Sequence, residues 1–139
     1  MSRLSVIDDS VKFVAAANRL TEDDNGKVIF LNSTTAFATT LPPLRAGLRL
    51  TIVVKAVPSG TQHTVITHAS ANVIIGSASS ADLNAASDAD FEATGCDTIN
   101  FVTAKTVKGD RVELLCDGVN WYADATSSLF DAITFTTTS

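Results

Sequence analysis

The chain has 139 residues, a mass of 14.6 kDa and 45% hydrophobic residues, which is enough for one domain with a packed core. Its net charge is -5 and its isoelectric point is about 4.7, so we expect neither nucleic acid nor an anionic membrane as a partner. No apolar run approaches the roughly 20 residues of a membrane-spanning helix, and no signal peptide is visible, so we expect synthesis and retention in the cytoplasm.

The first segment, residues 1–19, differs from the rest of the chain. It carries apolar residues, among them Leu4, Val6 and Phe13, that need a surface to cover them. Two interpretations stay open: a terminal arm that docks on a neighbour, or an edge strand of the same domain. The expected division is therefore an arm or edge strand over 1–19 and a β-sandwich domain over 20–139.

Helix is scarce in the predicted structure. Thr21 to Asp24 has the spacing of a capping box and Gly26 follows, which allows one helical turn. The segment from Ala81 to Ala93 is interpreted as a loop, because its three aspartates break any apolar stripe.

Strand-like runs rich in β-branched residues recur at roughly 8–12-residue spacing with turn residues between them. This pattern predicts an all-β fold, which we expect to be a single antiparallel, jelly-roll-like β-sandwich. The predicted strands are Val28 to Leu31, Leu48 to Lys55, Thr64 to Thr67, Val73 to Ile75, Thr98 to Val102, Arg111 to Cys116, Val119 to Ala123, and Ala132 to Thr136.

Asp117-Gly118 separates two of these runs and predicts a tight hairpin with a two-residue type I′ turn. In the first arm of the hairpin, Val112, Leu114 and Cys116 share one face by alternation. In the second arm we expect Trp121 to fill the core and Tyr122 to flank it.

Groups able to carry catalysis are few. His63 and His68 are five residues apart, so a shared metal is not expected, and both are interpreted as ordinary loop or surface histidines. Cys96 and Cys116 border strand-like segments and are expected to be buried thiols. The acid-rich stretches 22–26 and 88–92 are interpreted as solvated loops. We therefore expect no enzyme, no cofactor and no metal.

Six short segments, taken in order, resemble small structural proteins of tailed bacteriophages, of the capsid decoration or cement type. The resemblance covers about residues 20–136. The segments are Leu20 to Asn32, Thr39 to Pro43, Gly47 to Lys55, Ala71 to Gly76, Gly109 to Leu114, and Asp117 to Tyr122.

This resemblance implies a virion structural protein that binds the outer surface of the assembled head as a homotrimer and stabilises it. The implied partners are the major capsid protein and other copies of the chain. Related modules also occur in tail fibres and spikes, so a tail tip domain that binds a host receptor is the alternative. Because the N-terminal segment precedes the recognised part, we expect it to contact the capsid through Arg3, Leu4, Val6, Lys12 and Phe13.

Overall fold

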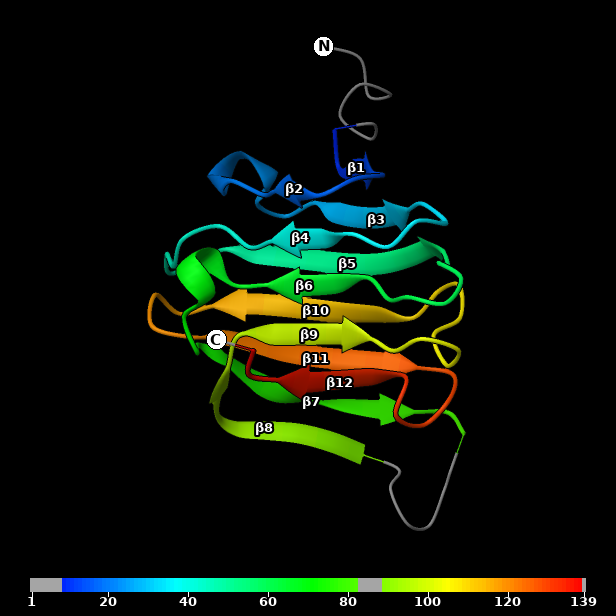
Figure 1. The fold of residues 1–139 in the computed structure, drawn as a ribbon. Coiled ribbons are helices and arrows are strands. Elements are labelled where there is room, and N and C mark those ends of the chain that lie inside the picture. The colour runs from blue at the N-terminus through cyan, green and yellow to red at the C-terminus, as the bar shows by residue number, and fades with distance from the viewer. Residues whose placement is uncertain (1–8, 83–88, 139) are drawn as a thin grey trace.

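The computed structural model describes residues 9–82 and 89–138 and shows a β-sandwich of two mixed sheets (Figure 1). The larger sheet has seven strands in the order β1-β3-β5-β10-β11-β7-β8, and the smaller has five in the order β12-β9-β6-β4-β2. The strands are β1 (Val11–Val14), β2 (Asn18–Arg19), β3 (Val28–Asn32), β4 (Ala38–Thr40), β5 (Arg49–Ala56), β6 (Thr64–Ile66), β7 (Ile74–Ser80), β8 (Ala89–Cys96), β9 (Thr98–Phe101), β10 (Arg111–Cys116), β11 (Trp121–Ser127) and β12 (Ile133–Thr136).

The predicted sandwich is confirmed, but the expected antiparallel jelly roll is wrong. Among the described residues, five of the ten strand pairings are parallel: β1 with β3, β3 with β5, β2 with β4, β4 with β6, and β7 with β11. The first six strands alternate between the sheets, and each of the first four pairs with the strand two places later, which runs in the same direction. This winding resembles three turns of a β-solenoid, and its turns differ in length, so the sequence shows no fixed period.

The first strands lie at one end of both sheets, at the top of Figure 1. β1 is an edge strand of the large sheet and β2 an edge strand of the small sheet. The described part of the segment 1–19 therefore contributes edge strands to the sandwich, which is one of the two interpretations left open above. The expected arm residues 1–8 lie outside the described residues.

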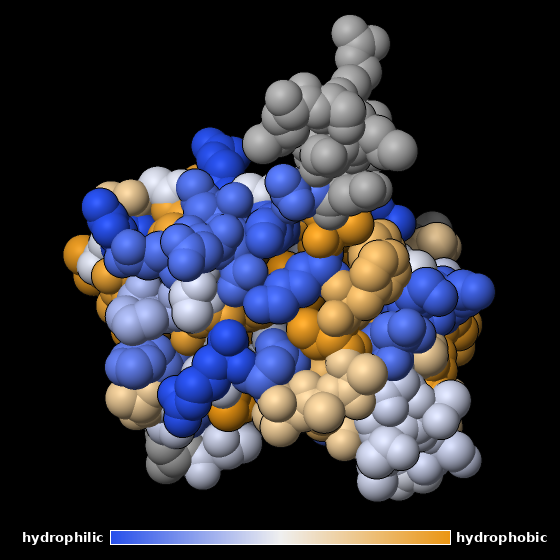
Figure 2. All heavy atoms as spheres, turned by 90° about the horizontal axis from the view of Figure 1, so that it is seen from above, coloured by the Kyte–Doolittle hydropathy of each residue, from blue (hydrophilic) through white to orange (hydrophobic). Residues whose placement is uncertain are grey.

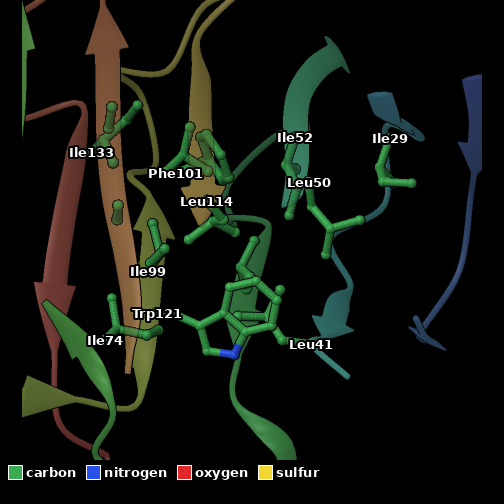
Figure 3. Packing of buried hydrophobic residues seen from close by; sticks show 14 of the residues in the cluster. Ile29, Leu41, Leu50, Ile52, Ile74, Ile99, Phe101, Leu114, Trp121 and Ile133 are labelled. Atoms are coloured by element: carbon green, nitrogen blue, oxygen red, sulfur yellow. The ribbon is translucent and has the colours of Figure 1, made fainter. Parts of the chain in front are cut away.

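The core lies between the sheets and is filled by alternating side chains (Figure 3). β10 and β11 alternate strictly between buried and exposed, which confirms the predicted inward face of Val112, Leu114 and Cys116. Trp121 is buried beside Leu41 and Ile99, while Tyr122 is 42% exposed, as predicted. Cys96 and Cys116 are both buried thiols, also as predicted.

β9 is more deeply buried than its alternating pattern indicates, because all four of its residues are buried. The amide of Asn100 donates to Thr134 Oγ1 and Thr136 Oγ1, and its carbonyl oxygen accepts from Gln62 Nε2. These bonds satisfy a polar side chain that would otherwise be costly to bury.

Two local predictions need correction. The segment 81–93 is not all loop, because β8 begins at Ala89.

The hairpin is tight, as predicted, but Asp117 N donates to Asn120 O at 3.2 Å, which makes Gly118 and Val119 the central residues. Gly118 has φ 94° and Val119 does not have a positive φ, the pattern of a type II′ turn rather than type I′. The Asp117 carboxylate accepts from both Val119 N and Asn120 N, which holds this aspartate before the turn.

Candidate binding surface

The outer face of the large sheet carries an apolar strip at its β1 end. The strands are in register, so Phe13, Phe30 and Val53 form one row across β1, β3 and β5, and Val11 and Val28 belong to the next. We call these five residues the apolar strip. The rings of Phe13 and Phe30 stack with centroids 5.2 Å apart, and Phe13 is 57% exposed although it is aromatic. Figure 2 looks down on this end of the molecule and shows apolar surface among polar residues.

The structure does not place all the predicted contact residues together. Arg3, Leu4 and Val6 lie outside the described residues, whereas Lys12 and Phe13 are neighbours on β1 and point to opposite faces of the sheet. Phe13 belongs to the apolar strip. Lys12 points inward, and its ammonium group lies 3.2 Å from Oδ1 of the buried Asp24.

Asp24 connects three parts of the chain near this end. It belongs to the short 3-10 helix Glu22–Asp24, where Thr21 and Asp24 form the predicted capping box. Its carboxylate accepts from Thr21 N at 2.9 Å and is close to the ammonium groups of Lys12 and Lys27, at 3.2 and 3.8 Å. Lys12 therefore attaches β1 to the domain. An inward-pointing charge of this kind also discourages unintended pairing at an edge strand.

A shallow groove of about 520 Å³ lies on the same outer face, across β5, β10 and β11. Its side chains form two rows by register: Arg49, Leu115 and Tyr122 in one, and Thr51, Glu113 and Asp124 in the other. We call these six residues the β5–β10–β11 groove. Leu115 is 39% exposed and Tyr122 is 42% exposed, so the groove has an apolar wall beside charged groups.

The Tyr122 side chain is held in place from the neighbouring turn. Its hydroxyl donates to Asp117 Oδ2 at 2.9 Å, and this bond raises the pKa of Tyr122. The backbone N–H groups of Asn120 and Val119, followed by the Tyr122 hydroxyl, lower the pKa of Asp117. The ring therefore stands in one orientation at the rim of the groove.

The histidines are far from equivalent. His68 is exposed, as expected, but His63 is completely buried, and the expectation of a loop or surface histidine missed this. Nδ1 of His63 accepts from Phe37 N at 3.4 Å, so Nε2 carries the proton and donates toward the carbonyl oxygens of Ser33 and Ala56. No signal in the sequence marks this histidine as buried. Desolvation lowers its pKa.

The acid-rich stretches are partly structural. Glu22 pairs with Arg45 at 2.6 Å on the surface, while Asp24 is buried, so 22–26 is not simply a solvated loop. In the second stretch, Glu92 lies on β8 and accepts from Thr94 N and Oγ1 and from Gly95 N, which lowers its pKa. Asp88 lies outside the described residues. Within the described ranges, no group of three or more His, Cys, Asp or Glu side chains could hold a metal ion.

Comparisons with known proteins identify no relative: no family model, no curated protein and no solved structure matches the chain. No helix in the described part of the chain is long and apolar enough to cross a membrane.

Proposed function

We propose that the chain is a bacteriophage virion structural protein, a decoration protein that binds the outer surface of the assembled head as a trimer. The observation that carries the proposal is the apolar strip with the exposed ring of Phe13, which lies within the N-terminal segment, residues 1–19. An exposed aromatic side chain stacked on a second ring is the type of anchor that dominates binding energy at protein interfaces. In this proposal Arg3, Leu4 and Val6 extend the contact, and Lys12 holds β1 in position through Asp24.

The six segments that resemble decoration proteins lie mainly in the strands and turns of the sandwich, and not in the proposed contact surface. They include the capped turn at Thr21, all of β3, most of β5, the start of β7, and the β10–β11 hairpin. These positions set the fold on which the apolar strip is displayed. The strip itself draws Phe13 and Val11 from before the recognised part.

Stabilisation of the head follows from mass action in this proposal. A protein that binds only the assembled lattice stabilises it by about RT ln(1 + [L]/Kd) per site. A trimer on a three-fold position makes three equivalent contacts at once, so contacts of modest strength combine into high avidity. Catalysis has no part in this mechanism.

The test is co-sedimentation with mature heads that have been depleted of the protein, with unexpanded procapsids for comparison. We expect saturable binding to mature heads alone, and at least tenfold weaker binding, about 1.4 kcal/mol, for Phe13→Ser and for a deletion of residues 2–8. Phe91→Ser is the matched control, because Phe91 is 73% exposed on β8 at the other edge of the same sheet.

Circular dichroism and the urea midpoint establish that each variant folds before it is tested. If Phe13→Ser and the deletion bind mature heads as the wild type does, this contact surface is wrong. If the wild type binds neither particle, the head assignment is wrong, and a glycan and host-cell screen then tests the tail-tip alternative.

A further inference from the structure

The β5–β10–β11 groove is lined by charged side chains of both signs. Lys27 and Arg49 line the side of the groove nearer to β3. Glu113 and Asp124, which are direct partners on β10 and β11, line the other side. A charged ligand of either sign would meet two like charges as well as two opposite ones, so its attraction to one side is largely cancelled by repulsion from the other. The groove therefore favours a ligand without net charge.

Three charged side chains of the groove are available to hydrogen-bond such a ligand. Within the described residues, Arg49, Glu113 and Asp124 take part in no ion pair and no side-chain hydrogen bond. The guanidinium group supplies several N–H donors, and the two carboxylates supply acceptors. A hydroxyl group can both donate and accept, and its hydrogen bonds to charged groups are stronger than those to neutral ones. A neutral ligand with many hydroxyl groups can therefore use both sides of the groove.

The apolar part of the groove restricts the ligand further. Tyr122 is 42% exposed, and its hydroxyl bond to Asp117 Oδ2 holds the ring in one orientation. Leu115, its register partner on β10, is 39% exposed and extends the apolar surface. Because the ring is already fixed, little conformational entropy is lost when a ligand stacks on it. A pyranose ring has C–H groups on its faces and hydroxyl groups around its rim, which matches an aromatic surface beside hydrogen-bonding groups.

We propose that the β5–β10–β11 groove binds a short neutral oligosaccharide, with one pyranose stacked on Tyr122 and its hydroxyl groups bonded to the charged side chains. The groove volume of about 520 Å³ lies within the range of roughly 300–1,000 Å³ for small-molecule sites. This inference goes beyond the proposed function, because it gives the chain a second ligand besides the head. The exposed rings of the two sites stand on different strands, Phe13 on β1 and Tyr122 on β11.

The first experiment titrates maltotriose, cellotriose and triacetylchitotriose into the isotope-labelled full chain and follows the amide chemical shifts. We expect at least one trisaccharide to shift the amides of β5, β10 and β11, and Tyr122→Ser to weaken its binding roughly tenfold or more. Phe91→Ser is the matched control, because it also removes an exposed ring from the same sheet and should bind like the wild type. No shifts with any of the three sugars, or equal binding by Tyr122→Ser, would overturn the inference.

Circular dichroism establishes that each variant folds. Tyr122→Leu, which keeps an apolar side chain without the ring, takes the place of Tyr122→Ser if the latter does not fold. The neutral character of the ligand is tested by comparing triacetylchitotriose with its deacetylated, cationic form and maltotriose with anionic trigalacturonate. We expect neither charged sugar to bind more tightly than the best neutral one. Tighter binding of either charged sugar would overturn the assignment to a neutral ligand.

Head co-sedimentation separates this inference from the proposed function. Tyr122→Ser should bind mature heads like the wild type, because it leaves the apolar strip unchanged. If this variant loses head binding, the groove contacts a protein and the saccharide assignment is overturned. If the wild type binds no heads but binds a neutral trisaccharide through Tyr122, the proposed function is wrong and this inference stands.

Discussion

His63 is the residue whose role depends most on its surroundings. It lies in the loop before β6 and links three separate backbone groups, Phe37 N, Ser33 O and Ala56 O. Its ring also contacts the Phe37 ring, with centroids 4.5 Å apart. A second proton would sit on Nδ1, where the Phe37 N–H already points, so protonation breaks this set of bonds.

His63 predicts a loss of stability in mild acid. Burial lowers its pKa in the folded state below the ordinary 6.5, so the unfolded chain binds the proton more readily. Its contribution to stability is complete above the unfolded pKa and declines as the pH falls from there through the folded pKa. We expect the urea midpoint of the wild type to fall between pH 7.5 and 5.5, and His63→Gln to show a smaller fall. His68→Gln is the control, and an equal fall in all three proteins would contradict the prediction.

The burial of residues in regularly alternating strands could be predicted from local sequence, whereas the burial of His63 could not. Alternation along β10 and β11 is enough to separate Trp121 from Tyr122. The burial of His63 depends on the loop before β4 and the end of β5, which lie 26 and 7 residues away from it in the chain. No short window of sequence contains that information.

Among the elements, β1 is held to the domain by a side chain as well as by its pairing with β3. It has four residues and lies at the edge of the sheet, so in the described part of the chain its backbone hydrogen bonds to a neighbouring strand on one side, to β3. The inward Lys12 and the buried Asp24 add a charged contact that fixes the position of Phe13 on the opposite face.

Asp24→Asn should therefore destabilise the protein by about 1–3 kcal/mol, because it leaves two partly buried ammonium groups without their carboxylate. Urea unfolding measures the loss, and amide exchange should rise first in β1. Glu22→Gln breaks an exposed pair and should stay within about 0.5 kcal/mol of the wild type. Equal effects of the two substitutions would show that Asp24 has no special role.

The elements differ in how much of them could be predicted. The capped turn at Thr21 and strands β3, β5, β6, β10 and β12 have the predicted positions within one or two residues, because caps and β-branched runs act locally. β8 was not predicted, because its sequence is rich in alanine and acidic residues and, within the described ranges, it pairs with β7 alone.

At the scale of the whole molecule, the winding between two sheets predicts slow, cooperative folding. Neighbouring strands in space are distant in the chain, as for β7 beside β11 and β6 beside β9, so loop-closure entropy must be overcome before most pairs form. Refolding on the scale of milliseconds to seconds or slower is expected.

Trp121 provides the measurement, because it is the only tryptophan and is 1% exposed in the centre of the core. Its fluorescence and the far-UV circular dichroism should report one coincident unfolding transition. Separate transitions would show that the two sheets, or the β1 end, unfold independently.

Residue spacing within a few positions was enough to predict the all-β sandwich, the position of the β10–β11 hairpin, and the burial of Trp121 and the two cysteines. The tertiary structure alone decided that half of the strand pairs are parallel, that His63 is buried, and that Lys12 faces Asp24 while Phe13 joins the apolar strip. These features depend on which strands become neighbours, and that choice is made by packing between segments far apart in the chain.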